Sequence, residues 1–190
     1  MSDTQDTPDA LLAAIDLGSN SFHLMIAKSD FGELRPVQAL AEKVQLGETS
    51  STAMLTPGAI DRGLACLERF KQLIDSTAPA KIRIVGTNAL RRAKNRQAFI
   101  DPAEQIMNAP IDVIYGREEA RLIYLGVAHT LSDDANVRLV IDIGGGSTEF
   151  ILGERFEPKR LESLQMGCVS YGRRYLPDGF IDREGFEAAY

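Results

Sequence analysis

The sequence is poor in cysteine and histidine, the residues that most often build zinc sites and disulfide frameworks. It contains two cysteines and two histidines among 190 residues. Cys66 and Cys168 lie far apart, form no CxxC pair and have no clustered histidine partners. Neither a zinc site nor a disulfide framework is therefore indicated. We expect both cysteines to be buried, reduced thiols.

Long apolar runs and a basic charge excess are also missing. No stretch of 18 apolar residues occurs, and the first ten residues, MSDTQDTPDA, are polar and acidic, unlike a secretory leader. The formal net charge is -6, so the chain lacks the basic field that nonspecific nucleic-acid binding requires. We therefore expect a cytoplasmic protein with a disordered tail at residues 1–10, no integral membrane segment and no nucleic-acid partner. A polyanion would have to be bound locally.

What is present is an ordinary globular composition, 44% hydrophobic and 25% charged, with one glycine-rich turn between two apolar runs. Residues 140–151 read VIDIGGGSTEFI, which predicts a strand, a tight turn and a strand. Glycines can adopt positive φ and leave no side chain between the backbone and a ligand, so successive N–H groups can converge on an anion, most simply phosphate. Asp142 ends the first strand and would anchor Mg²⁺, which prefers one or two carboxylates plus substrate phosphates. For three glycines alone, a plain hairpin turn is an equally good interpretation.

A second copy of this pattern lies 126 positions earlier. Residues 14–26 read AIDLGSNSFHLMI, and the shift places Asp16 on Asp142 and Gly18 on Gly144. Both copies continue to a glycine, Gly47 or Gly167, and then to related segments at residues 57–61 and 178–182. Self-similarity over such a period implies duplicated units. Two facing phosphate-binding hairpins, each with an aspartate at its strand end, predict a cleft that holds a phosphate chain and a metal between two lobes.

The order of apolar periods predicts an α/β fold. We expect an antiparallel meander of three strands, an amphipathic helix that starts at Pro57 with Thr56 as its N-cap, and then alternating strands and helices. In the last helix Leu122, Leu125 and Gly126 are expected to face inward. The predicted strands are 11–17, 22–28, 34–46, 81–86 and 111–115, and the later helices are 95–108, broken at Pro102, and 116–130.

The segment SDDAN, residues 132–136, is the polar, turn-rich stretch between the two copies, so we place a lobe boundary there. Lobe I covers residues 11–134 and lobe II residues 135–190. The first copy runs roughly 80 residues beyond its Pro-Gly segment, whereas the second ends 11 residues after Gly179. We expect an N-terminal piece with an incomplete second lobe, which by itself would be poorly active.

Two charged clusters remain open to two interpretations each. Arg91, Arg92, Lys94 and Arg96 follow the strand at 81–86; they form either a solvated helix face or a phosphate site beyond a strand end. Glu118 and Glu119 lie in the first turn of the helix at 116–130, where carboxylates also complement the helix dipole.

These segments together resemble the motifs of a known family. IDLGSNSFHLMI and IDIGGGSTEFI are similar to the two phosphate motifs of the actin, heat-shock chaperone and sugar kinase superfamily. Three more segments resemble the exopolyphosphatase and guanosine pentaphosphate phosphatase branch: GTNALRRAKN at 86–95, GREEARLIYLGV at 116–127 and MGCVSYG at 166–172. The resemblance extends from Leu12 onward, and the joint order of five motifs is specific.

The resemblance implies a fold of duplicated actin-like, ribonuclease H-like lobes, with a mixed sheet of an antiparallel meander plus parallel strands flanked by helices. It implies that Glu119, the second glutamate of EEAR, is the catalytic carboxylate and that Arg91 contacts substrate phosphate. Mg²⁺ would be carried by Asp142, with Asp16 or Glu149 acting through waters. The phosphate would be held by two turns, whose residues are Gly18, Ser19, Asn20, Ser21, Gly144, Gly145, Gly146 and Ser147.

The implied reaction is hydrolysis of a terminal phosphoanhydride, with Glu119 orienting or deprotonating the water. Polyphosphate and guanosine pentaphosphate present the same terminal group, and we favour polyphosphate. A homodimer is implied for the full-length protein. Two other classes remain: an ATP-dependent kinase or ATPase of the superfamily, against which the EEAR and GTNALRRAKN segments argue, and a polyphosphate-binding module without turnover.

Overall fold

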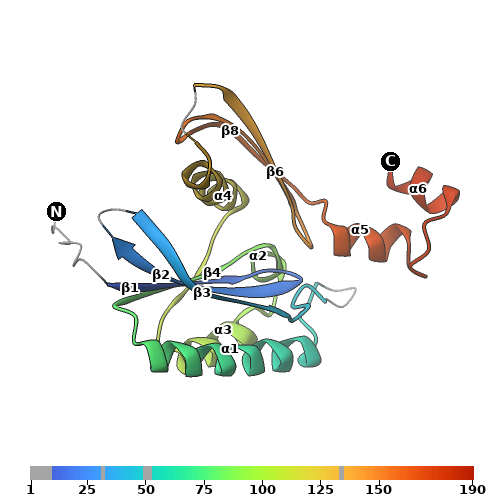
Figure 1. Cartoon of the computed structure of the whole chain (residues 1–190). Coiled ribbons are helices and arrows are strands. Elements are labelled where there is room, and N and C mark those ends of the chain that lie inside the picture. The colour runs from blue at the N-terminus through green and yellow to red at the C-terminus, as the bar shows by residue number, and fades with distance from the viewer. Residues whose placement is uncertain (1–9, 31–32, 49–52, 133–134) are drawn as a thin grey trace.

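The larger sheet is centred on β1 (Leu11–Leu17), in which Ala13, Ile15 and Leu17 alternate on one face and are buried. The structure is a computed structural model that describes residues 10–30, 33–48, 53–132 and 135–190 (Figure 1). The other strands of this sheet are β2 (Ser21–Asp30), β3 (Glu33–Lys43), β4 (Lys81–Gly86) and β5 (Ile111–Val113). Their order is β3-β2-β1-β4-β5; β1 to β3 are antiparallel, and β1, β4 and β5 are parallel. The expected mixed sheet is confirmed.

The strand predicted at 34–46 ends earlier, at Lys43. Gln45 adopts a φ of 56°, which no strand tolerates, and the N–H groups of Val44 and Gln45 both bond to the carbonyl of Asn20. The end of the meander therefore folds back onto the first glycine turn and fixes its position. The turn predicted at residues 30–33 includes residues 31–32, which lie outside the described residues.

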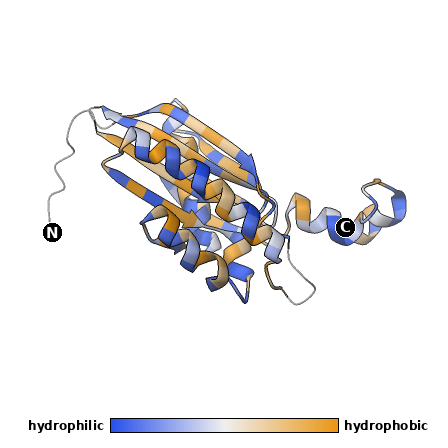
Figure 2. Cartoon of the chain, turned by 90° about the horizontal axis from the view of Figure 1, so that it is seen from below, coloured by the Kyte–Doolittle hydropathy of each residue, from blue (hydrophilic) through white to orange (hydrophobic). Residues whose placement is uncertain are grey.

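Two helices cover the face of the sheet that carries the buried β1 side chains (Figures 1 and 2). The first, α1 (Pro57–Thr77), begins as predicted, because the Thr56 hydroxyl accepts a hydrogen bond from the Ala59 N–H at 3.2 Å. The second, α3 (Gln97–Met107), packs beside α1. A short helix, α2 (Asn88–Arg92), follows β4.

The predicted helix break at Pro102 is wrong, because α3 runs through this residue. Proline removes one backbone hydrogen bond, but Phe99 and Ile100 before it and Ala103 and Met107 after it are buried against the sheet. Burial of apolar side chains on both sides of the proline stabilises the helical path.

The smaller sheet consists of three antiparallel strands, β6 (Val137–Ile143), β7 (Thr148–Glu154) and β8 (Glu157–Leu164). Helix α4 (Gly116–Thr130) leaves the larger sheet and packs on β7 and β8. Its buried residues are Ala120, Tyr124 and Ala128, which share one face by their spacing of four.

The face predicted for this helix is wrong in one respect. Gly126 is exposed, and Leu122 and Leu125 are only half-buried. The reason is that α4 packs on the smaller sheet and not on the larger one. Its buried face therefore consists of the residues that cluster with Ile151 of the smaller sheet.

The internal repeat is visible in the structure, with one change. Helix α6 (Arg183–Ala189) begins 126 positions after α1, and its N-cap Asp182 accepts a hydrogen bond from the Gly185 N–H at 2.7 Å, as Thr56 does from Ala59. The predicted match of residues 57–61 with residues 178–182 is therefore wrong by five positions, because residues 178–182 precede their helix. Capping geometry identifies the helix start, whereas the shared Pro/Asp-Gly composition does not.

The last two helices leave part of the smaller sheet uncovered. Helix α5 (Cys168–Tyr175) and α6 pack on each other, away from β6. Cys168 is exposed and Cys66 is buried, so the expectation of two buried thiols is wrong for Cys168, which lies at the open start of α5. In the part of the chain that is described, no helix is both long and apolar enough to cross a membrane.

Candidate active site

Two tight turns face each other between the sheets. Residues 18–20 connect β1 to β2, and residues 144–147 connect β6 to β7. They nearly touch: a Cβ added to Gly145 would lie 3.2 Å from the Asn20 Cβ, and one added to Gly146 would lie 3.1 Å from the Ser19 Oγ. The structure thus brings both predicted turns to one cavity of about 270 Å³, lined by Gly18, Ser19, Asn20, Ser21, Gly144, Gly145, Gly146 and Ser147.

The glycines of the second turn serve close packing. Positive φ, although open to glycine, is not used at Gly144, Gly145 or Gly146. A Cβ on Gly144 would lie 3.1 Å from the Ser147 carbonyl oxygen, and one on Gly167 would lie 2.4 Å from the backbone of the turn. Larger residues would push the turn away from its partner.

Carboxylates also line this cavity. Asp16 and Asp142 are each the second-last residue of a strand, and they pair across their hairpins with His23 and Glu149. Directly opposed residues share one face of a sheet, so both pairs belong to the cavity wall, together with Glu119. Four carboxylates in one cavity create a strongly negative site.

Asp16 shows the electrostatic consequence. Its Oδ1 is buried without a hydrogen-bond partner, although part of the side chain is open and Oδ2 lies 4.0 Å from Nδ1 of His23. Burial is the main cause that raises the pKa of Asp16; His23 lowers the pKa and Asp142 raises it further. An orphaned oxygen beside a second carboxylate is suited to a cation.

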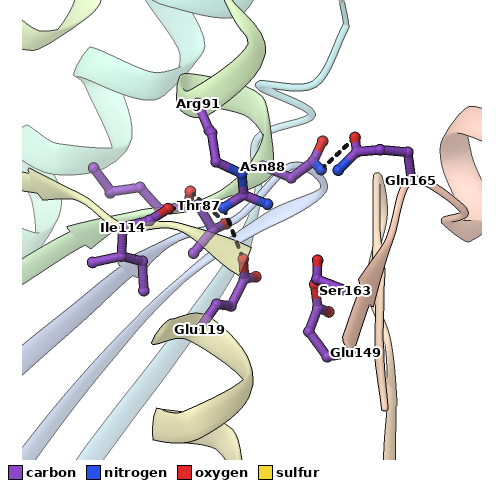
Figure 3. Close-up of polar contacts among 9 residues, drawn as sticks. Thr87, Asn88, Arg91, Ile114, Glu119, Glu149, Ser163 and Gln165 are labelled. Carbon is purple, nitrogen blue, oxygen red and sulfur yellow. Dashed lines mark hydrogen bonds and ion pairs between the residues drawn. The ribbon is translucent and has the colours of Figure 1, made fainter. Parts of the chain in front are cut away.

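Glu119 comes from the first turn of α4 and is 14% exposed. Burial raises its pKa to about 7, with further increases from Glu149 and Asp16, and the hydrogen bond from Arg91 opposes this shift. Its Oε2 accepts that bond from Arg91 Nη1 at 3.0 Å (Figure 3). Near neutral pH this carboxyl group therefore exchanges a proton readily.

Arg91 is hydrogen-bonded to Glu119 (Figure 3) and is not among the residues that line the cavity. Its Nη1 also donates to the carbonyl of Ile114 at 2.8 Å, and its Nη2 is buried without a partner. The arginine therefore orients Glu119 in this structure, and direct contact with a phosphate stays a prediction. Of the neighbouring cations, Arg92 lines a second cavity, whereas Lys94 and Arg96 are exposed.

Glu118 points away from the cavity. Both of its oxygens accept hydrogen bonds from Arg121, at 2.7 and 2.8 Å, and these bonds lower its pKa. Adjacent helical residues point about 100° apart, which is why only one of the two glutamates lines the cleft.

Several contacts at the site were not predicted from the sequence. Glu149 is 1% exposed and accepts a hydrogen bond from the Ser163 hydroxyl at 2.8 Å. Asn88 Nδ2 donates to Gln165 Oε1 at 3.0 Å and so connects the two sides of the cleft (Figure 3). Thr87 and Asn88 directly follow β4, where the carboxyl ends of parallel strands collect ligand-binding residues, so their position was a usable signal. Gln165 carries no such signal.

The residues predicted to bind metal suit a cation that is also ligated by substrate phosphate and water. They do not form a complete metal site by themselves. In the described ranges, no three His, Cys, Asp or Glu side chains are grouped to hold a metal by themselves. The donors in the cavity are hard carboxylate oxygens, and the Asp16 Oδ1 lacks a partner. Mg²⁺ commonly takes one or two carboxylates and completes its shell with phosphate and water. Asp16 and Asp142, with Glu149 beside them, meet that requirement.

Comparison with known proteins agrees with this geometry. The sequence profile of the Ppx/GppA phosphatase family matches residues 25–190. The chain belongs to this family. Phosphatases of the Ppx/GppA family are generally metal-dependent, and the duplicated α/β architecture is the actin-like fold.

Three members of the Ppx/GppA family show the extent of the similarity. The chain is 44% identical over 180 residues to a guanosine-5'-triphosphate,3'-diphosphate pyrophosphatase of Photobacterium profundum, covering 94% of this chain and 36% of that protein. It is 43% identical over 179 residues to a putative exopolyphosphatase of Haemophilus influenzae, covering 94% and 55%. An exopolyphosphatase structure from Cytophaga hutchinsonii superposes with a TM-score of 0.80 at 34% identity, covering 90% and 53%. The chain thus spans about a third to a half of these relatives.

Proposed function

We propose that the protein releases terminal phosphate from inorganic polyphosphate by hydrolysing a phosphoanhydride bond. The observation that supports this best is Glu119, a carboxylate with a pKa of about 7 on the wall of a cavity that two glycine turns enclose. A general base works best when its pKa lies near the working pH.

The turns, Glu119 and Arg91 have separate roles in the proposed hydrolysis. The N–H groups of the two turns hold the terminal phosphate, and a water between that phosphate and Glu119 loses its proton to the Glu119 carboxylate. Arg91 keeps this carboxylate in place through its bond to Oε2. Asp142, Asp16 and Glu149 would hold the Mg²⁺ that we propose, and the bound ion would supply positive charge beside the phosphate oxygens.

Guanosine pentaphosphate hydrolysis is the second candidate function. It is supported by the name of the Photobacterium profundum relative, which is 44% identical over 180 residues. Both substrates end in the same phosphate group, so one site serves both. A cytoplasmic location and a homodimer of the full-length protein remain part of the same proposal.

The test is phosphate release with polyphosphate and guanosine pentaphosphate side by side, in Mg²⁺ and without other nucleotides. Protein in excess over substrate makes slow turnover measurable, because each active site then needs to act only once. Release above the protein-free rate supports hydrolysis, and the faster substrate is the preferred one. Release from neither substrate, together with transfer of phosphate to an acceptor in a separate assay that contains ATP, would support the kinase alternative instead.

A further inference from the structure

The face of the smaller sheet that α4 covers changes from apolar to polar within one step along its strands. One cross-strand row is apolar and packs with the buried residues of α4. Its members are Val140, Ile151 and Leu161. Two positions nearer to the second glycine turn, the next row on the same face consists of Asp142, Glu149 and Ser163. Ser163 therefore stands in one row with two of the carboxylates proposed to bind metal.

Ser163 is the member of this row that fixes Glu149. Its hydroxyl donates a hydrogen bond to Oε1 of Glu149 at 2.8 Å (Figure 3). Glu149 is 1% exposed, and in the described part of the chain no other side chain donates a hydrogen bond to it. Buried polar groups depend on the partners that the protein gives them. This one bond therefore directs the Glu149 carboxyl group.

The start of α4 packs directly on the Ser163 hydroxyl. A Cβ built on Gly116, the first residue of α4, would lie 2.4 Å from the Ser163 Oγ. A larger side chain at position 163 would push away the helix turn that carries Glu119. Ser163 itself is not among the residues that line the active-site cavity. It can therefore affect that cavity only through its neighbours, of which Glu149 is the one it binds.

A competing partner for Glu149 lies near the same point. The Arg91 Nη2 is 3.7 Å from the Cβ built on Gly116 and is buried without a hydrogen-bond partner. A guanidinium N–H that has no partner attracts a carboxylate that no other donor holds. The Ser163 hydroxyl holds Oε1 of Glu149 and so opposes this alternative pairing.

We infer that Ser163 is a positioning residue, which holds Glu149 beside Asp142 so that both carboxylates can serve one Mg²⁺. The inference rests on the proposed function, because the cation is the one proposed for the hydrolysis site. Hydrogen bonds to metal-binding side chains orient them, and loss of such a bond commonly lowers metal affinity by about 10- to 100-fold. Ser163 therefore sets how tightly the cation is held, although it does not line the cavity.

The test measures Mn²⁺ binding to the 190-residue chain by electron paramagnetic resonance, which detects the free ion. We expect Ser163→Ala to weaken Mn²⁺ binding by about tenfold or more. Glu149→Gln should weaken binding too. Adding Ser163→Ala to Glu149→Gln should then change the affinity by less than about twofold, because the hydroxyl has no carboxylate left to orient. Equal losses in both backgrounds would mean that Ser163 acts through general structure, and would overturn the inference.

The matched control is Ser29→Ala, which also removes a buried serine hydroxyl from a strand. Ser29 is 7% exposed, belongs to β2 and does not line the active-site cavity. Its Mn²⁺ affinity should stay within about twofold of the unsubstituted chain. A loss as large as that of Ser163→Ala would overturn the inference, as would the absence of Mn²⁺ binding by the unsubstituted chain at millimolar concentrations.

Thermal melts show whether each variant is folded before its affinity is compared. If Ser163→Ala does not fold, Ser163→Cys takes its place, because a thiol keeps a weak donor at this position. Its loss of Mn²⁺ affinity should be smaller than tenfold but again absent in the Glu149→Gln background. A loss that persists in that background would overturn the inference.

Phosphate release separates this inference from the proposed function. If release occurs, but Ser163→Ala changes neither the Mn²⁺ affinity nor the Mg²⁺ concentration needed for half-maximal release, only the inference fails. If no release occurs, but Mn²⁺ binding depends on Ser163 and Glu149 as expected, the hydrolase proposal fails and the positioning role of Ser163 stands.

Discussion

At the scale of single residues, the environment of Glu119 separates it from its neighbour. Glu119 is 14% exposed, bonded to Arg91 and surrounded by the carboxylates of Glu149 and Asp16, whereas Glu118 is 37% exposed and paired with Arg121. The substitution Glu119→Gln keeps the size and the hydrogen bond but removes the base. We expect phosphate release to fall by on the order of 100-fold or more, measured under single-turnover conditions, while polyphosphate binding persists or tightens.

Glu118→Gln is the matched control for that prediction. It removes an exposed ion pair, a change of small energetic worth, so release should stay within about twofold of the unsubstituted protein. Equal losses in both variants would show that the two glutamates act only on the helix dipole or on stability.

The raised pKa of Glu119 also predicts how stability depends on pH. The folded-state pKa is about 7, above the ordinary 4.5 of a free glutamate. Between these values the folded state holds a proton that the unfolded state has lost, so ionisation of Glu119 weakens folding as pH rises, by up to about 3 kcal/mol above pH 7. Below pH 4.5 the group is neutral in both states and contributes nothing.

Glu119→Gln should therefore be more stable than the unsubstituted protein at pH 8 and equally stable near pH 4.5. Thermal melts at several pH values without divalent cations measure this difference. Other groups, including Asp16, titrate in both proteins and largely cancel. If the melting-temperature difference does not change between pH 4.5 and 8, folding does not raise the pKa of Glu119.

The positions of candidate side chains could be predicted from the sequence where a strand end or a helix position determined what they could reach, and their roles stay a prediction. Asp16 and Asp142 were placed by strand ends, and Glu119 by helical geometry combined with the family's pattern. Arg91 was expected to contact substrate phosphate, which stays a prediction, and its hydrogen bond to Glu119 was not foreseen. The bond of Ser163 to Glu149 depends on the register of β7 and β8, which the sequence does not determine.

At the scale of elements, the position of α4 depends on one small residue of the smaller sheet. A Cβ on Gly153 of β7 would lie 2.2 Å from the Tyr124 ring, and the Tyr124 hydroxyl donates to the carbonyl of Arg155 at 3.1 Å. Because α4 also carries Glu119, the same packing orients the catalytic candidate.

We expect Gly153→Ala to destabilise the protein by about 1–3 kcal/mol through overpacking, measured by urea unfolding. Gly126→Ala is the control: Gly126 is exposed in the same helix with nothing within 4 Å of the added Cβ, so it should stabilise by about 0.5–1 kcal/mol. Combining Gly153→Ala with Tyr124→Leu should restore part of the loss. An additive loss in the double variant would rule out the clash as the cause.

The elements themselves were largely predictable, because alternating apolar residues, the Thr56-Pro57 cap and the first-turn carboxylates are local signals. The exceptions required knowledge of what an element packs against. Pro102 sits within a helix that has buried apolar side chains both before and after the proline, and Gly126 faces solvent because α4 covers the smaller sheet and not the larger one. The helix start at Arg183 was missed because similar composition was taken for equivalent position.

At the scale of the whole molecule, the repeat relates two sheets that differ in how they are covered. Ala13, Ile15 and Leu17 of β1 are at most 4% exposed beneath α1 and α3. Their counterparts 126 positions later in β6 are 49 to 68% exposed: Leu139, Ile141 and Ile143. The division into lobes at residues 132–136 stays a prediction, and residues 133–134 lie outside the described part of the chain.

The exposed face of β6 predicts self-association of the 190-residue chain. Val137 extends this apolar row at 62% exposure, and β6 is also an edge strand with unpaired backbone groups. An exposed apolar edge strand of this kind pairs readily with another chain. Sedimentation velocity over a range of protein concentrations should therefore show species larger than the monomer at the high end.

Ile141→Lys places a charge in the middle of this row and should shift the association to at least about tenfold higher concentration, since burying an unpaired lysine in an interface is costly. Ile181→Lys is the matched control, because Ile181 is 81% exposed but lies between α5 and α6, away from the sheet. It should leave the association unchanged. A monomer at all concentrations, or equal effects of the two lysines, would show that the uncovered face of β6 does not bind a second copy.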